Sequence, residues 1–93
     1  MEKAQAHLLI SGRVQGVFYR SFTEDVALSL GLKGWVKNCS DGMVEAVFEG
    51  KKEDIEKAII LCHKGPPASK VNSIDVKWEK FTNEFDSFSI RYF

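Results

Sequence analysis

The 93-residue sequence lacks an excess of charge of either sign and has no long hydrophobic run. Thirteen basic residues balance thirteen acidic ones, whereas proteins bind nucleic acids and anionic membranes mainly through clustered Lys and Arg. The longest apolar run near the start, Leu8-Leu9-Ile10, is much too short for a signal-peptide core or a membrane span. We therefore expect a cytoplasmic protein with no nucleic-acid partner and no membrane partner.

Cysteine and histidine are also scarce, with two residues of each. Cys39 and Cys62 are too few for a disulfide scaffold and lack CxxC spacing. Their number permits one disulfide, but without a secretory signal we expect free thiols. His7 and His63 form no cluster with cysteines or carboxylates at metal-ligand spacing. The sequence thus predicts neither a metal nor a cofactor.

What the sequence does contain is enough apolar material for one core. Hydrophobic residues make up 44% of the chain and include seven Phe and two Trp. A chain of this length has room for one core of useful size, and no linker or low-complexity tract divides it. We therefore expect a single domain over residues 1–93 and, with balanced charge, a monomer.

Hydrophobic periodicity predicts a strand–helix–strand unit that occurs twice. Strands are expected at residues 6–13, 34–38, 43–49 and 73–80, and a shorter one at 88–92. Along 43–49, apolar side chains alternate with Glu45 and Glu49, which should face water. Ser21 and Glu24 have the spacing of a capping box, which predicts that the first helix begins at Ser21.

The second helix is expected over residues 51–64, because the Pro66-Pro67 pair that follows cannot continue a helix. Strands that are polar on one side leave one sheet face in water, and right-handed crossovers place both helices on the other face. The sequence thus predicts an α+β fold, a two-layer ferredoxin-like sandwich of β-α-β-β-α-β order. Its sheet should be mainly antiparallel, with an additional short C-terminal strand.

The most informative segment is residues 12–20, GRVQGVFYR. A glycine-containing loop that leads into a helix leaves backbone N–H groups unpaired, and these form a cradle for an anion together with the helix dipole. Gly16 permits the loop to curl, and Arg20 is placed to hold the same anion with two parallel hydrogen bonds. On these residues alone, a loop that merely turns and a solvated arginine are equally good interpretations.

Asn38 is a second candidate, since it closes a strand immediately before the Asp41-Gly42 turn. Asn is common beside turns because its side chain bonds the local backbone, and this structural interpretation is the stronger one for Asn38 in isolation. A carboxamide does not titrate usefully, so a functional Asn38 would position a group such as water rather than act as a base.

Together these segments resemble the signatures of the acylphosphatase family. Residues 12–20 resemble its first signature, and Gly34-Trp35-Val36-Lys37-Asn38 with the following turn resembles its second. Residues 65–71, GPPASKV, and 88–90, FSI, resemble its later segments, so the resemblance covers nearly the whole chain. Two positions depart from the family pattern, with Tyr19 where Phe is frequent and Cys39 where Thr or Arg is usual.

The resemblance implies a ferredoxin-like enzyme that hydrolyses acyl phosphates to a carboxylate and inorganic phosphate, without metal or cofactor. It implies that Arg20 binds the phosphoryl group and that Asn38 orients the attacking water. The residues expected to hold the substrate are those of the loop and the helix start, namely Gln15, Gly16, Val17, Phe18, Tyr19 and Arg20.

Two other functions are compatible with this topology. A ferredoxin-like RNA-binding module would carry aromatic residues on its third strand, but residues 43–49 read MVEAVFE, with one Phe and two acids. A non-catalytic anion-binding module would keep the loop without turnover, although the presence of both Arg20 and Asn38 favours an enzyme.

Overall fold

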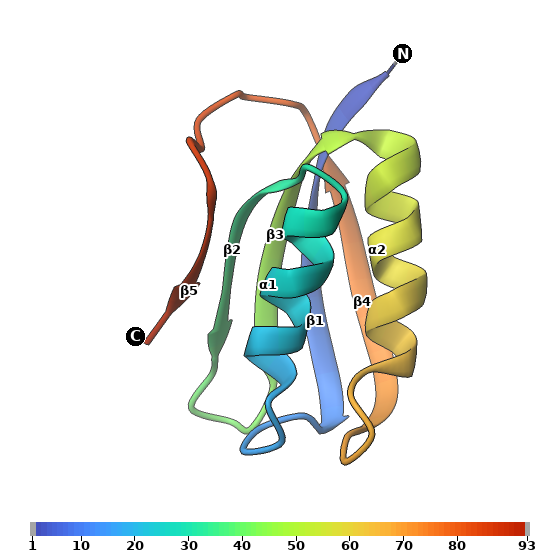
Figure 1. Cartoon of the computed structure of the whole chain (residues 1–93), viewed down its shortest axis with the longest axis vertical. Coiled ribbons are helices and arrows are strands. Elements are labelled where there is room, and N and C mark those ends of the chain that lie inside the picture. The colour runs from blue at the N-terminus through green and yellow to red at the C-terminus, as the bar shows by residue number, and fades with distance from the viewer. Residues whose placement is uncertain (1, 93) are drawn as a thin grey trace.

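The computed structural model describes residues 2–92 and has two layers, a five-stranded sheet and two helices that cover one of its faces (Figure 1). Its elements confirm the predicted order and fold class. They are β1 (Lys3–Arg13), α1 (Tyr19–Ser29), β2 (Lys33–Asn38), β3 (Val44–Lys51), α2 (Lys52–Lys64), β4 (Lys70–Glu79) and β5 (Phe88–Arg91). Neither helix is long and apolar enough to cross a membrane, as far as residues 2–92 are concerned.

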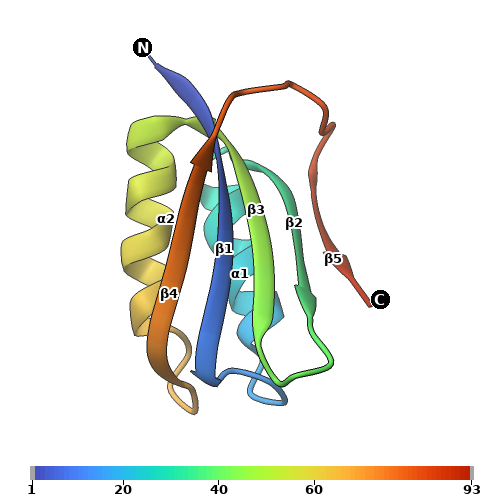
Figure 2. The ribbon, with the colours of Figure 1, turned by 180° about the vertical axis from the view of Figure 1, so that it is seen from behind.

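The sheet has the strand order β4-β1-β3-β2-β5. All neighbours are antiparallel except β2 and β5, which run parallel with Gly34 opposite Phe88. From behind, the sheet shows a face that carries no helix, with β5 along one edge (Figure 2). The C-terminal strand, whose partner the sequence leaves open, therefore lies beside β2.

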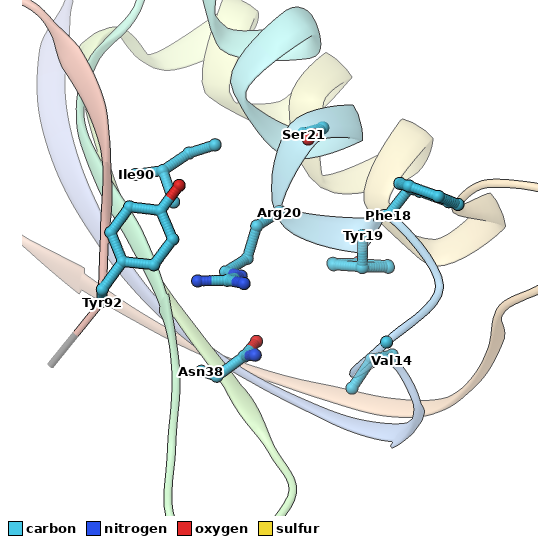
Figure 3. A pocket seen from close by; sticks show the side chains of 9 residues that line it. Val14, Phe18, Tyr19, Arg20, Ser21, Asn38, Ile90 and Tyr92 are labelled. Carbon is cyan, nitrogen blue, oxygen red and sulfur yellow. The ribbon is translucent and has the colours of Figure 1, made fainter.

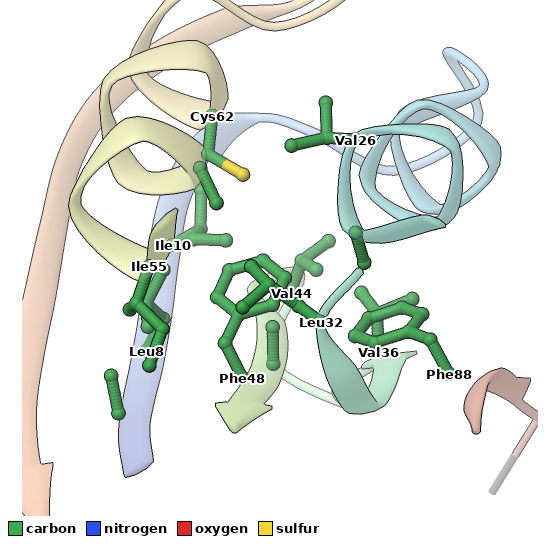
Figure 4. Close-up of a cluster of buried hydrophobic side chains, with 14 of the residues drawn as sticks. Leu8, Ile10, Val26, Leu32, Val36, Val44, Phe48, Ile55, Cys62 and Phe88 are labelled. Carbon is green, nitrogen blue, oxygen red and sulfur yellow. The ribbon is translucent and has the colours of Figure 1, made fainter. Parts of the chain in front are cut away.

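The core lies between the sheet and the helices (Figure 4). Alternate residues of β1, such as Leu8 and Ile10, are fully buried because successive side chains of a strand point to opposite faces. Helix α2 contributes Ile55 and Cys62, both also fully buried, and Phe88 of β5 stacks on Phe48 with ring centroids 5.6 Å apart. Truncating one such large side chain to Ala costs about 2–5 kcal/mol of stability.

The start of α1 differs from the prediction. The helix begins at Tyr19, with Phe18 as its N-cap residue and no side-chain capping hydrogen bond, so the Ser21–Glu24 capping box is wrong. The Phe22 N–H already donates to the Phe18 carbonyl, which places the first helical turn ahead of Ser21. Tyr19 fixes this start, because its side chain is buried in the core and its hydroxyl donates to the Cys62 carbonyl at 2.6 Å.

Glu49 is the second difference, since it is only 1% exposed although its strand pattern predicted a water-facing side chain. The connection from β4 to β5 passes beside this end of β3, and the backbone N–H groups of Thr82 and Asn83 donate to the Glu49 Oε2 atom. The alternation correctly indicated the sheet face of Glu49, but this connection, rather than water, covers it.

Candidate active site

A pocket of about 250 Å³ lies where the β1–α1 loop, the start of α1, the end of β2 and strand β5 meet (Figure 3). Its lining combines backbone, one cation, one carboxamide and apolar side chains from segments far apart in the sequence. The lining residues are Val14, Gly16, Phe18, Tyr19, Arg20, Ser21, Asn38, Ile90 and Tyr92. The fold thus brings the predicted residues Arg20 and Asn38 to the same pocket.

The loop before α1 has left-handed residues and unpaired N–H groups, which are features that favour anion binding. Val14 is buried and anchors the loop, while Gly16 and Phe18 have φ values of 73° and 64°, in the left-handed region. Among residues 2–92, no backbone carbonyl accepts a hydrogen bond from the N–H groups of residues 15–18. The first turn of α1 adds further free N–H groups and the positive end of the helix dipole. These donors together suit a phosphate or carboxylate.

Arg20 lies in the first turn of α1, and its guanidinium points into the pocket toward Asn38 (Figure 3). Its side chain is half-buried, which does not fit the interpretation of Arg20 as a fully solvated arginine. Its guanidinium carbon lies 4.9 Å from the centroid of the Tyr92 ring. The pocket therefore holds one permanent positive charge, and the residues that line it include no carboxylate, histidine or cysteine.

Asn38 ends β2, opposite Val44, and its Oδ1 atom is buried without a hydrogen-bond partner among the described residues. The adjacent turn does not use this side chain, because the Met43 N–H is bound instead by the Asp41 carboxylate at 3.0 Å. An unpaired buried acceptor costs about 1–3 kcal/mol, and since Asn38 lines the pocket, this atom is a candidate to accept a hydrogen bond from a bound group. This geometry disfavours the purely local interpretation of Asn38.

Gln15 and Val17 take a different part from the other predicted loop residues. The Gln15 Nε2 atom donates to the carbonyls of Cys39 and Met43, each at 2.8 Å, and so ties the loop to the β2–β3 hairpin. The Val17 side chain packs against the core. Neither residue is among those that line the pocket.

The Tyr19 hydroxyl and the two thiols of the chain are not activated as nucleophiles. Burial and the neighbouring Cys62 raise the pKa of the Tyr19 hydroxyl well above its ordinary value. Burial, followed by the Glu45 carboxylate, raises the pKa of Cys39, and burial raises that of Cys62 to about 12. Both thiols are free, as expected, and high pKa values keep them in the unreactive protonated form.

Sequence reasoning did not assign four lining residues to the site, namely Val14, Ser21, Ile90 and Tyr92. Val14 and Ser21 flank the predicted segment, whereas Ile90 and Tyr92 are far from it in the sequence. Their alternation with buried Phe88 indicated a final strand, but only the parallel pairing of β5 with β2 places them beside Arg20. A one-dimensional pattern contains no information on that pairing.

The comparisons with known proteins agree with this fold and pocket. The family model for acylphosphatase matches residues 6–90. An acylphosphatase of Pelotomaculum thermopropionicum is 49% identical over 92 residues, covering 99% of this chain and all of that one. An acylphosphatase of a Roseiflexus species is 48% identical, over 97% of each chain.

Among solved structures, the crystal structure of acylphosphatase from Bacillus subtilis superposes with a TM-score of 0.93. It is 37% identical and covers 96% of this chain and 99% of that one. The two-layer fold places the chain in a class of small α+β domains. Within that class, the chain belongs to the acylphosphatase family.

Proposed function

We propose that this enzyme hydrolyses acyl phosphates to a carboxylate and inorganic phosphate, with Arg20 and Asn38 as its two catalytic side chains. The proposal rests on family membership and, above all, on the pocket in which unpaired loop amides, the Arg20 guanidinium and the unpartnered Asn38 Oδ1 meet. The amides of residues 15–20 and Arg20 hold the phosphoryl oxygens. Asn38 accepts a hydrogen bond from the attacking water and thereby positions it.

Such a sparse site suffices because the leaving group is a carboxylate. Its conjugate acid has a pKa of about 4, so it departs without a proton from a general acid. Water forms a new bond to phosphorus while the bond between phosphorus and the acyl oxygen breaks, and that oxygen takes the electron pair. Positioning and charge stabilisation supply most of the catalysis in phosphoryl transfer, and the cradle and Asn38 offer both.

The proton of the attacking water requires an acceptor, and the residues that line the pocket offer no carboxylate or imidazole. We infer that a phosphoryl oxygen of the substrate takes this proton and keeps it in the inorganic phosphate product. The same reasoning leads us to propose a metal-independent and cofactor-free reaction. We also propose that the protein is a monomer and that it is cytoplasmic.

The deciding experiment is hydrolysis of benzoyl phosphate by the purified protein with EDTA present. We expect sustained release of benzoate and phosphate above the spontaneous rate, with EDTA leaving the rate unchanged. Binding of inorganic phosphate without turnover would instead support the non-catalytic anion-binding module. Loss of activity in EDTA would overturn the metal-independent mechanism.

A further inference from the structure

Among residues 2–92, the Tyr92 ring is the one aromatic group of the pocket lining in cation–π contact. It contacts the Arg20 guanidinium, although Tyr92 as a whole is 75% exposed to solvent. Strand β5 brings it there, because Arg91 pairs with Lys37 in the parallel register and the next residue reaches the level of Asn38. Figure 3 shows Tyr92 and Asn38 on either side of the Arg20 guanidinium.

Arg20 has no other partner in the described structure that would fix its orientation. Among residues 2–92, no carboxylate lies within 4.0 Å of its guanidinium, whereas His7 and Lys37 both have an ionic partner in Glu45. A long side chain without such a partner keeps several rotamers, and selecting one of them on ligand binding costs conformational entropy. The ring of Tyr92 is thus the contact that restricts it.

An aromatic ring against a guanidinium has a specific advantage for a phosphate site. The ring attracts the cation through its π electrons and has no carboxylate oxygens that would take up the N–H donors of the guanidinium. A carboxylate partner would occupy the same edge that a phosphoryl group needs for two parallel hydrogen bonds. The ring therefore restricts the orientation of Arg20 and leaves its donors available.

We propose that Tyr92 is a positioning residue that orients Arg20 for the phosphoryl group through the face of its ring. This inference rests on the proposed function, since it assigns Arg20 to phosphate binding. It gives a role in the site to a residue that directly follows the C-terminal strand and lies outside both signature segments. The ring acts through Arg20 and makes no bond to the reacting atoms.

The experiment is a set of Tyr92 variants titrated with inorganic phosphate by calorimetry. We expect Tyr92→Ala and Tyr92→Leu to weaken phosphate binding by roughly twofold to fivefold, the range of an exposed cation–π contact. Tyr92→Phe should restore wild-type affinity, because it keeps the ring and loses only the hydroxyl. Thermal unfolding of each variant shows whether the fold is intact.

A matched control comes from a cation–π pair away from the pocket, in which the Lys52 ammonium lies 5.4 Å from the centroid of the Trp78 ring. Trp78→Ala should leave phosphate affinity unchanged. In an Arg20→Ala background, Tyr92→Ala should have no further effect on phosphate affinity, as expected for a residue that acts through another.

The outcomes separate this inference from the proposed function. If the wild type binds phosphate and hydrolyses benzoyl phosphate but Tyr92→Ala binds phosphate equally well, the positioning role is wrong and the enzyme assignment stands. Equal losses from Tyr92→Ala with and without Arg20 would also overturn it, because the ring would then act on the ligand directly. If the wild type neither binds phosphate nor hydrolyses the substrate, the proposed function fails first.

Discussion

Asn38 and Glu49 lie at opposite ends of the β2–β3 hairpin, and the protein surrounds their buried oxygens differently. Asn38 pairs with Val44 at the end that faces the pocket, whereas Glu49 pairs with Lys33 at the other end. The Asn38 Oδ1 atom has no partner within residues 2–92. The Glu49 Oε1 atom also has none, but four groups donate to Glu49 Oε2, from Gln5, Thr82 and Asn83.

This difference separates a structural polar group from a candidate functional one. The donors to Glu49 come from β1 and from the connection between β4 and β5, so the carboxylate holds that connection against the sheet. The Asn38 Oδ1 atom contributes no such link, although this atom is buried as well. We therefore expect changes at the pocket end to affect catalysis and changes at the Glu49 end to affect stability.

The largest effect should come from Arg20→Ala. Loss of a preorganised donor to developing charge lowers kcat by roughly 10²–10³, and loss of the guanidinium also weakens phosphate binding. Steady-state hydrolysis of benzoyl phosphate and phosphate titration measure the two effects. Arg13→Ala, which removes an exposed arginine at the end of β1, is the matched control and should leave both unchanged. Wild-type turnover in Arg20→Ala would refute the assigned role.

Asn38→Ala should lower kcat by a similar factor, roughly 10²–10³, but should leave phosphate affinity nearly intact. Water positioning affects the chemical step, whereas the phosphate is held by the cradle and Arg20. Thermal stability should not fall, since the substitution removes an acceptor that has no partner in the protein. Asn72→Ala, an exposed asparagine on β4, is the control. Phosphate binding weakened as strongly as in Arg20→Ala would exclude the water-positioning role.

Glu49→Gln should have the opposite signature. An uncharged amide accepts weaker hydrogen bonds and adds donors where donors already converge, so we expect a loss of about 1–3 kcal/mol in unfolding free energy. Glu45→Gln is the control on the same strand and sheet face, where a half-buried carboxylate meets His7 and Lys37 and should contribute less. Urea unfolding measures the difference. A Glu49→Gln variant with full stability but reduced kcat would reverse the comparison.

The sequence predicts most of this fold because its alternation and helical periodicity follow directly from burial. Each strand and helix was predicted within a few residues, and the Asp41-Gly42 turn forms as expected. The predicted start of α1 at Ser21 was wrong because Tyr19 gains a buried tertiary hydrogen bond to the Cys62 carbonyl. A distant partner of this kind outweighs a local capping preference.

The site was predicted less completely, for a topological reason. Arg20 and Asn38 reach the same pocket as the resemblance implied, but Ile90 and Tyr92 complete it only because β5 pairs with β2. Period-two alternation tells which side chains share a face, and it does not tell which strand is the neighbour. For the same reason it could not show that the connection after β4 covers Glu49.

Gln15→Met should give a smaller effect on catalysis than either pocket substitution. The Gln15 side chain links the loop to the hairpin that carries Asn38, and the loss of its hydrogen bonds is worth about 1 kcal/mol, or a few-fold in kcat. If the link acts through Asn38, the loss should shrink in an Asn38→Ala background. The kinetics of the double variant measure this coupling, and an undiminished loss would show that Gln15 acts on the loop alone.

The smallest effect should appear in the way the free energy of unfolding changes at acidic pH. Burial by itself raises the pKa of Glu49, but the hydrogen bonds it accepts, those from Thr82 first, outweigh burial and hold its pKa below the ordinary value. Its stabilisation is therefore fully present above the unfolded carboxyl pKa of about 4.3 and is lost as the pH falls through the lower folded-state value. The stability difference between wild type and Glu49→Gln should be constant near neutral pH and should narrow below about pH 4. Urea unfolding across that range tests the sign, because a difference that widens on acidification would mean that the folded protein favours the protonated carboxyl.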